Sequence, residues 1–340
     1  MNEPIRKMTI GDRAPNFMLE DLTGSPHELY NTDITGGPII ILVPGQVSST
    51  AIFKQFAEKA EAFNAFGAHR YALLPSGKNI SEETGASGFI PLHDPGNAVS
   101  HGYLNPSGLT GPAMFALDPN QRIVAIADGS DGAGFANTAL TAFARIAPRE
   151  PSKQVSMQAP VLFIPDVLDS ADCDRLIETW QGGDKQKNVI NVASGAQTSK
   201  TGRSEVKRRS DVIIEGSLER HLLVTLMPRI APEVERVFSF DKEWGFEKFR
   251  VGCYESEDSG FFKAHRDNLS EALSHRHFAA SINLNDGYEG GHLRFPEYGI
   301  DHYAPTKGGA LIFSCGLLHE VVPVTTGHRF TLLTFISTRI

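Results

Sequence analysis

Apolar and polar positions divide the chain into two parts with different periodicities. In the first part, short apolar runs alternate with longer segments in which apolar residues recur every three to four positions, the pattern of strands alternating with helices. Strands are expected at 39–43, 69–74, 113–117 and 122–127, and helices at 49–65 and 135–146. A turn at Asp118-Pro119-Asn120 joins the last two strands. This order predicts an α/β domain over residues 1–150.

From residue 155 onward the pattern changes from mixed to mainly β. Helices are expected at 170–180, where Asp169 or Ser170 can cap the amino end, and at 218–229. Short strands separated by turn residues then follow at 248–254, 279–284, 292–295, 310–313, 319–324 and 328–336. Strands so spaced predict a jelly roll or β-sandwich with flanking helices over residues 155–340. The proline-containing segment 147–154 is the predicted linker.

Composition narrows the class of protein. The chain has 340 residues, of which 41% are hydrophobic and 21% are charged, as in an ordinary globular protein. Its net charge of −8 argues against a nucleic-acid partner. Three widely spaced cysteines in the second part exclude a disulfide framework and a cysteine-rich zinc site. No membrane span or secretory signal is recognised, so we expect a cytoplasmic protein without a membrane partner.

Histidines gather in the β region, where seven of the twelve lie between His265 and His328. His265 and Asp267 are two residues apart, so on an extended segment both side chains project from one face. His319 opens a predicted strand and is a third candidate ligand. Two imidazoles and one carboxylate leave open coordination positions and suit Fe(II). The sequence therefore predicts an iron site formed by these three residues.

A second signal follows His319. The segment Thr325-Thr326-Gly327 predicts a three-residue hairpin loop in which Val324 pairs with His328. In that register Arg329 and Thr331 point to the same face as His319. Arginine grips carboxylates bidentately, so Arg329 is a candidate for binding a dicarboxylate that also reaches the metal.

These segments resemble the prolyl-4-hydroxylase-like branch of the Fe(II)/2-oxoglutarate-dependent oxygenases. The resemblance rests on segments 161–177, 254–267, 288–296, 307–313 and 318–329. It implies a double-stranded β-helix, or jelly roll, in which His265, Asp267 and His319 bind iron. It also implies that Arg329 holds the distal carboxylate of 2-oxoglutarate, with help from Tyr254 and Thr331.

The resemblance implies a reaction as well. Fe(II), 2-oxoglutarate and O₂ would hydroxylate an unactivated C–H bond of an amino acid, a peptidyl side chain or a related metabolite, with release of succinate and CO₂ and with ascorbate as a possible accessory. Related halogenases have a small residue where this chain has Asp267, so hydroxylation is favoured. Prolyl hydroxylases proper have lysine at the position of Arg329, so the resemblance does not single out proline as substrate.

Basic residues cluster in a polar, Gly- and Ser-rich segment between the predicted helices. They are Lys185, Lys187, Lys200, Arg203, Lys207, Arg208 and Arg209. The segment is interpreted either as a solvated loop or as a mobile lid that binds an anionic substrate group. Arg209 is the first candidate for a substrate contact from this segment, and Arg294, on a strand beside the metal site, is the second.

Residues 8–147 resemble the peroxiredoxins of the thioredoxin fold, in segments 11–19, 44–48 and 115–123. In that family a reactive cysteine opens a helix, but here Ala51 stands at the cysteine position and Ser48 at that of the motif threonine. Because alanine is no nucleophile, we expect no peroxidase activity from this domain. Dimerisation, partner docking or a wall of the substrate site are its expected roles.

Two other functions remain open from the sequence. The oxygenase domain could bind metal or a partner without catalysis, as a sensor or scaffold. A thiol peroxidase using Cys173 or Cys253 is a further alternative.

Overall fold

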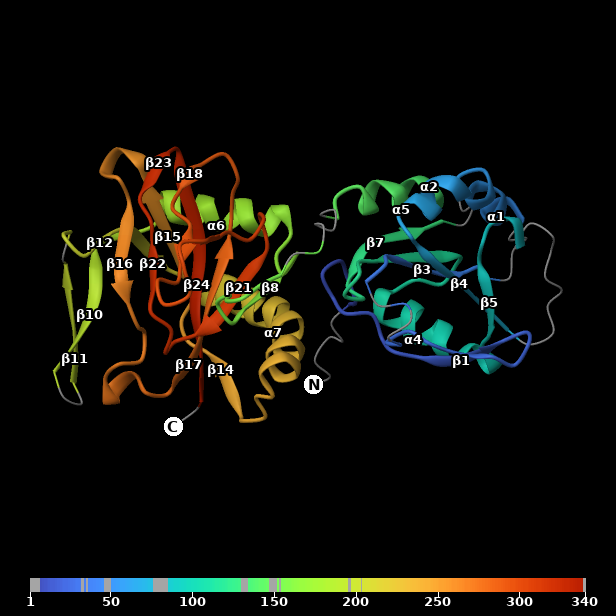
Figure 1. Ribbon diagram of the computed structural model, residues 1–340, viewed down its shortest axis with the longest axis horizontal. Coiled ribbons are helices and arrows are strands. Elements are labelled where there is room, and N and C mark those ends of the chain that lie inside the picture. The colour runs from blue at the N-terminus through green and yellow to red at the C-terminus, as the bar shows by residue number, and fades with distance from the viewer. Residues whose placement is uncertain are drawn as a thin grey trace. The chain divides into compact units, whose positions relative to one another are not determined.

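The structure is a computed structural model of the 340-residue chain (Figure 1). It describes residues 7–31, 34, 36–45, 50–75, 85–129, 134–146, 152, 154–194, 197–202 and 204–338. The chain divides into two compact units, Met1–Pro151 and Ser152–Ile340. This division falls inside the proline-containing segment 147–154. Each unit is described by itself below.

A seven-stranded mixed sheet forms the N-terminal unit, in the order β2-β1-β5-β4-β3-β6-β7. The strands are β1 (Met18–Asp21), β2 (Pro26–Glu28), β3 (Ile39–Val43), β4 (His69–Leu74), β5 (Ile90–His93), β6 (Ala113–Leu117) and β7 (Ile123–Asp128). Strands β3, β4 and β5 run parallel, whereas β6 and β7 are antiparallel to their neighbours. All five residues of β3 are buried, because this strand is covered on both faces.

Helices cover both faces of this sheet (Figure 1). They are α1 (Thr50–Ala57), α2 (Ala60–Ala65), α4 (Ala98–Ser107) and α5 (Phe135–Phe143). The helix expected at 49–65 is therefore two shorter helices, and α4 was not predicted. Its apolar residues form only a weak stripe and it contains Pro106, so periodicity gave no signal.

Alternating helices and strands agree with the predicted α/β class of this unit. Ala51 is an exposed residue in the first turn of α1, so the described residues place a methyl group there. Ser48 lies outside the described residues. The thioredoxin-like assignment stays a prediction.

Two antiparallel sheets form the C-terminal unit. The larger has the order β8-β21-β17-β24-β15-β13-β9 with β14 also on β24, and the smaller has the order β12-β16-β22-β19-β20. The larger sheet contains β8 (Val161–Ile164), β9 (Gln186–Lys187), β13 (Ser210–Ile213), β14 (Trp244–Phe246), β15 (Arg250–Glu255), β17 (Arg276–Asn283), β21 (Ala310–Ser314) and β24 (His328–Thr338). The smaller contains β12 (Lys207–Arg208), β16 (Phe261–His265), β19 (Leu293–Arg294), β20 (His302–Tyr303) and β22 (His319–Val321).

Two-stranded pairs complete the unit. They are β10 (Val189–Ser194) with β11 (Gln197–Gly202), and β18 (Glu289–Gly290) with β23 (Val324–Thr326). One buried apolar cluster combines residues of the larger sheet, Ala279 and Leu311, with residues of the smaller sheet, Leu293 and Val321. The two sheets therefore face each other across a shared core, as the jelly-roll prediction requires.

Helices α6 (Ser170–Gly182) and α7 (Gly216–Phe238) pack on the other face of the larger sheet. Asp169 caps α6 by accepting a hydrogen bond from the backbone of Asp172 at 2.8 Å, as one of the two predicted caps. Helix α7 extends beyond the predicted 218–229 despite two internal prolines, each of which costs about 3 kcal/mol in a helix interior. A buried stripe offsets this cost: Leu222, Leu226, Ile230 and Val234.

The predicted hairpin after His319 is wrong. Strand β23 pairs with β18, where Gly290 opposes Val324, and does not pair with β24. Strand β24 instead crosses to the larger sheet, between β15 and β17. Pro323 has no N–H to donate, and Val324 donates its backbone N–H to Gly260 at 2.9 Å, so both direct this segment away from a hairpin.

No helix among the described residues is long and apolar enough to cross a membrane.

Candidate metal centre

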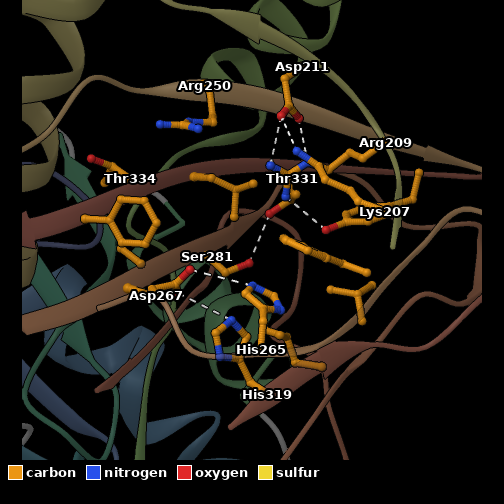
Figure 2. Close-up of a pocket in the computed structure, with 18 of the residues that line it drawn as sticks. Lys207, Arg209, Asp211, Arg250, His265, Asp267, Ser281, His319, Thr331 and Thr334 are labelled. Carbon is orange, nitrogen blue, oxygen red and sulfur yellow. Dashed lines mark hydrogen bonds and ion pairs between the residues drawn. The ribbon is translucent and has the colours of Figure 1, made fainter. Parts of the chain in front are cut away.

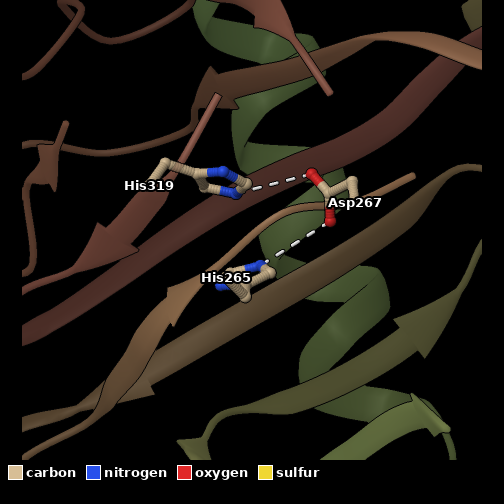
Figure 3. A group of neighbouring side chains, drawn as sticks. All are labelled: His265, Asp267 and His319. Atoms are coloured by element: carbon tan, nitrogen blue, oxygen red, sulfur yellow. Dashed lines mark ion pairs between the residues drawn. The ribbon is translucent and has the colours of Figure 1, made fainter. Parts of the chain in front are cut away.

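Two paired strands of the smaller sheet bring the candidate ligands together. His265 ends β16 and His319 begins β22, and the two are directly paired across the strands. Asp267 follows two residues after His265, and its backbone N–H donates to the Cys315 carbonyl at 3.0 Å. One ligand atom from each of the three residues lies within 4.8 Å of the others (Figure 3). The three residues named from the sequence therefore form one cluster.

Each histidine ring is held by a backbone carbonyl. His265 Nδ1 lies 2.8 Å from the Lys263 carbonyl, and His319 Nδ1 lies 3.0 Å from the Leu317 carbonyl. Because a carbonyl only accepts, both Nδ1 atoms carry the proton, and the Nε2 lone pairs are free. These Nε2 atoms lie 3.6 Å and 3.4 Å from the two oxygens of Asp267. The hydrogen bonds from Nδ1 to the two backbone carbonyls are of the kind that orients histidines as metal ligands.

Burial, and after it the neighbouring His319, lowers the pKa of His265 to about 4. The His265 imidazole is therefore neutral near pH 7, as metal coordination requires. Two imidazole nitrogens and one carboxylate oxygen are the donor set that suits a non-haem Fe(II) with open positions.

Arg329 lies in the same cavity, on β24. Its side chain is only 2% exposed. Nη1 donates to the Gly291 carbonyl at 2.7 Å, whereas Nε is buried without a hydrogen-bond partner. Among the described residues no carboxylate pairs with this guanidinium. A buried, unpaired guanidinium is costly, so the residues present fit a carboxylate ligand at this position.

Thr331 and Ser281 continue from Arg329 in a hydrogen-bond chain. Thr331 donates its hydroxyl to the Ile282 carbonyl at 3.0 Å, and the Ser281 and Thr331 hydroxyl oxygens are 3.1 Å apart. Since the Thr331 proton is already used, Ser281 is the donor in that pair. Arg329 Nη2 in turn lies 3.5 Å from the Ser281 oxygen. Thr331 thus helps to fix Arg329 through Ser281, a residue that the sequence did not indicate.

Tyr254, on β15, is buried and contacts a polar cluster whose members Lys207, Arg209 and Asp211 are labelled in Figure 2. Its oxygen accepts a hydrogen bond from Arg209 Nη1 at 3.0 Å, which leaves the phenolic proton free to donate to a ligand. Arg209 also donates to the two oxygens of Asp211, at 2.5 Å and 3.0 Å. Lys207 Nζ donates to Asp211 at 2.7 Å. We call Lys207, Arg209, Asp211 and Tyr254 the Asp211 cluster.

Charges in the Asp211 cluster shift one another. Burial raises the pKa of Asp211, but Arg209 and Lys207 outweigh this and hold it below its usual range. Burial, followed by the positive charge of Arg209, lowers the pKa of Lys207 to about 7. Asp211 is therefore ionised at neutral pH, while Lys207 is near its midpoint.

The two tentative substrate residues have different outcomes. Arg209 does line the cavity, but its charge is matched by Asp211, and its side chain is buried in the cluster rather than carried by a free loop. Arg294 lies on the face of β19 opposite Leu293, which lines the cavity, and its Nη2 lies 2.6 Å from Glu320. The structure therefore places Arg294 outside the cavity, because strand residues alternate between faces. Arg203 lies outside the described residues, and the lid stays a prediction.

The cavity between the sheets measures about 270 Å³. It is lined by the candidate ligands His265, Asp267 and His319, by Arg329, by the Asp211 cluster and by Arg250 on β15. Sequence reasoning missed Arg250, although the alternation of Arg250, Gly252 and Tyr254 along one strand could have indicated a shared face.

The jelly-roll core and the donor set of His265, Asp267 and His319 are features of the class of non-haem iron oxygenases. Comparison supports the class: residues 249–337 match the model of the 2OG-Fe(II) oxygenase superfamily. The matched residues lie within the C-terminal unit, and the matched family implies Fe(II) and 2-oxoglutarate as cofactor and cosubstrate.

Individual relatives are hydroxylases. The chain is 26% identical over 197 residues to mouse procollagen-lysine,2-oxoglutarate 5-dioxygenase 1, covering 54% of this chain and 25% of the relative. It is 23% identical over 192 residues to a PKHD-type hydroxylase of Synechococcus, covering 53% of this chain and 79% of the relative. The matching region thus spans about a quarter of the mouse protein.

Among solved structures, a Pseudomonas putida prolyl-4-hydroxylase has 16% identity and a TM-score of 0.42, covering 54% of this chain and 94% of that one.

Proposed function

We propose that the protein is an Fe(II)- and 2-oxoglutarate-dependent dioxygenase that hydroxylates an unactivated C–H bond of an amino acid, a peptidyl side chain or a related metabolite. The observation that carries the proposal is the pairing of His265 and His319 around Asp267, with the unpaired Arg329 in the same cavity. Neither feature alone would indicate this chemistry, but a metal site and a carboxylate site together fit a metal-chelating dicarboxylate.

When bound, iron and 2-oxoglutarate supply O₂ activation, with release of succinate and CO₂. The chain's own residues would bind the metal and 2-oxoglutarate and orient them. His265, Asp267 and His319 would hold the metal, and three protein ligands would leave coordination positions for other ligands. Arg329 binds the distal carboxylate, and Tyr254 donates its phenolic proton toward the same group. Phe313 and Leu293 are among the side chains that give the cavity apolar walls.

The test is succinate formation by the purified 340-residue chain with Fe(II), 2-oxoglutarate and O₂, during a screen of amino acids and peptides. We expect succinate release that depends on iron and is stimulated by a substrate, with a product heavier by one oxygen atom in mass spectrometry. His319→Ala should abolish it, and Arg294→Gln, outside the cavity, should retain it. The proposal fails if the iron-loaded protein neither consumes nor binds 2-oxoglutarate.

The non-catalytic alternative predicts a different result. A sensor or scaffold would bind metal and 2-oxoglutarate but would form no succinate with any compound in the screen, and its biological function would survive His319→Ala.

The thiol peroxidase alternative is disfavoured by the cysteines themselves. Cys173, Cys253 and Cys315 are all buried and free. Burial raises the pKa of each thiol, that of Cys173 to about 12. A thiol that is buried and protonated is a poor nucleophile toward peroxide.

For the N-terminal unit we propose a non-enzymatic role in dimerisation or partner docking. No cysteine precedes Cys173 in the sequence, which supports a role without thiol chemistry. Light scattering of the full chain and of a chain starting at residue 152 tests whether a homodimer depends on this unit.

A further inference from the structure

Cationic side chains outnumber carboxylates on the cavity wall. The cations are Lys207, Arg209, Arg250, Arg266, Arg276 and Arg329, and the carboxylates are Asp211 and Asp267. This imbalance is unusual for a cavity whose walls are largely apolar, since buried charges are generally paired. The partners of each cation therefore show which charges are left for ligands.

Two of the arginines are neutralised from outside the cavity. Arg276 donates to both oxygens of Glu247, at 2.8 Å and 2.7 Å. Arg266 donates to Glu297 at 2.7 Å. Neither is available to a ligand without breaking a charged hydrogen bond.

Lys207 and Arg209 share the single carboxylate of Asp211. Arg329 has no carboxylate partner and is accounted for by 2-oxoglutarate in the proposed function. Arg250 remains. Among the described residues, no acceptor lies within hydrogen-bond distance of its guanidinium, and in Figure 2 the guanidinium projects away from Asp211.

Charge balance gives the same result. Outside the two arginines with external partners, four cations face Asp211 and Asp267. Fe(II) and 2-oxoglutarate carry equal and opposite charges, so their binding leaves the excess of positive charge unchanged. Even with Lys207 neutral, the excess persists. A bound anion would remove it.

Arg250 and Arg329 serve separate positions in the cavity. Arg250 pairs with Leu333 across β15 and β24, and Tyr254 pairs with Arg329 in the same ladder. Four residues of strand separate the two pairs, or about 13 Å of backbone. Arg329 is fixed on the Gly291 carbonyl, so a second anion is needed to engage Arg250.

We infer that Arg250 binds a carboxylate of the substrate, so that the substrate is a small carboxylic acid such as a free amino acid; this inference rests on the proposed function. The cavity of about 270 Å³ must also hold 2-oxoglutarate, which favours a small molecule over a folded polypeptide. Arginine presents a planar fork that matches a carboxylate in two hydrogen bonds. In this role Arg250 determines specificity and does not take part in bond making.

The test compares carboxylic acids with matched amides. Free L-amino acids and their carboxamides, together with blocked peptides containing Asp or Glu against Asn or Gln, are screened for stimulated succinate release. Binding is measured separately by calorimetry on protein loaded with Mn(II) and 2-oxoglutarate, a readout that needs no turnover. Wild type, Arg250→Gln, Arg250→Lys and the control Arg294→Gln are compared.

We expect acids to bind and stimulate, and their amides to fail. Arg250→Gln should weaken acid binding about 30-fold or more, with an unchanged affinity for 2-oxoglutarate. Arg250→Lys should recover part of the loss, and Arg294→Gln should match wild type. Stimulation by blocked Asp or Glu peptides, without stimulation by any free amino acid, would overturn the inference of a small carboxylic acid.

The inference is overturned if amides bind as well as acids, if Arg250→Gln leaves acid affinity unchanged, or if no carboxylic acid in the panel binds. In each case 2-oxoglutarate still binds the metal-loaded protein. Loss of that binding in wild type would instead contradict the proposed function, so the two failures are distinguishable.

Discussion

Asp211→Asn tests whether one buried carboxylate holds the polar wall of the cavity together. Asp211 is 5% exposed and accepts three charged hydrogen bonds, two from Arg209 and one from Lys207. Asparagine has nearly the same shape but no charge, so the substitution leaves two buried cations without a counter-ion. Breaking a buried ion pair from one side costs about 3–5 kcal/mol. For a domain of this size that lowers the melting temperature by roughly 6–20 °C.

The pH dependence of this loss follows from Lys207, whose pKa is about 7 in the folded protein against an ordinary value of 10.5. Above pH 7 Lys207 is neutral in wild type and variant alike, so only Arg209 is left unpaired. Below pH 7 wild-type Lys207 is charged and bound to Asp211, a contact that the variant lacks. The destabilisation should therefore be larger at pH 6 than at pH 9.

Tryptophan fluorescence during urea unfolding is a suitable assay. The two tryptophans, Trp180 and Trp244, lie in α6 and β14, so the signal follows the C-terminal unit alone. The double variant Asp211→Asn/Lys207→Met should recover part of the loss at pH 6, because it removes one unpaired cation. The reasoning is refuted if Asp211→Asn unfolds within about 0.5 kcal/mol of wild type, or if its loss is equal at both pH values.

Three further predictions concern the same unit. Gly252→Ala should destabilise the protein by about 1–3 kcal/mol in the same urea assay and weaken 2-oxoglutarate binding. The reason is that a Cβ at residue 252 would lie 2.8 Å from Arg209 Cδ and 2.9 Å from an Asp211 oxygen. Unchanged stability and unchanged affinity for 2-oxoglutarate would contradict this packing. His319→Ala should weaken Mn(II) binding more than about 100-fold by calorimetry, with the external Arg294→Gln as control. The three cysteines should stay unreactive toward a thiol reagent until urea unfolds the protein, and rapid labelling of the native state would show that their burial is wrong.

Strands that consist of one continuous apolar run were predicted well, because their own residues are enough to indicate a buried strand. The apolar runs at 39–43, 69–74 and 113–117 coincide with β3, β4 and β6. Strand β5 was missed because it is short and contains Pro91, a residue that usually argues against a strand. Helix α4 was missed because its apolar residues do not form a clear stripe.

Pairing between distant segments was predicted less well. The sequence indicated that Arg329 and His319 share a pocket, and the structure places both in one cavity, but by a different route. A hairpin would have put them in one sheet, whereas β22 and β24 lie in facing sheets. Which strand Val324 pairs with depends on Gly290 and Gly260, residues far away in the sequence.

The candidate ligands were visible in the sequence because His265 and Asp267 are close neighbours and metal donors are few. Arg250 and Ser281 could not be predicted from the sequence, since arginine and serine are common residues. Their roles depend on which hydrogen-bond partners the fold places beside them. Arg294 shows the reverse error. Its place on a predicted strand beside the site suggested a substrate contact, but the alternation of β19 turns the side chain away from the cavity, toward Glu320.

Direct pairing of His265 with His319 also has a consequence for local motion. These residues end β16 and begin β22, and Asp267 extends the contact to the loop at Cys315. A metal bound by all three residues would link the end of β16 to the start of β22, in addition to the backbone hydrogen bonds between these strands. Local opening of these strands would then require release of the ion, so amide hydrogen exchange in β16 and β22 would slow in proportion to metal occupancy while β17 and β21 stayed unchanged.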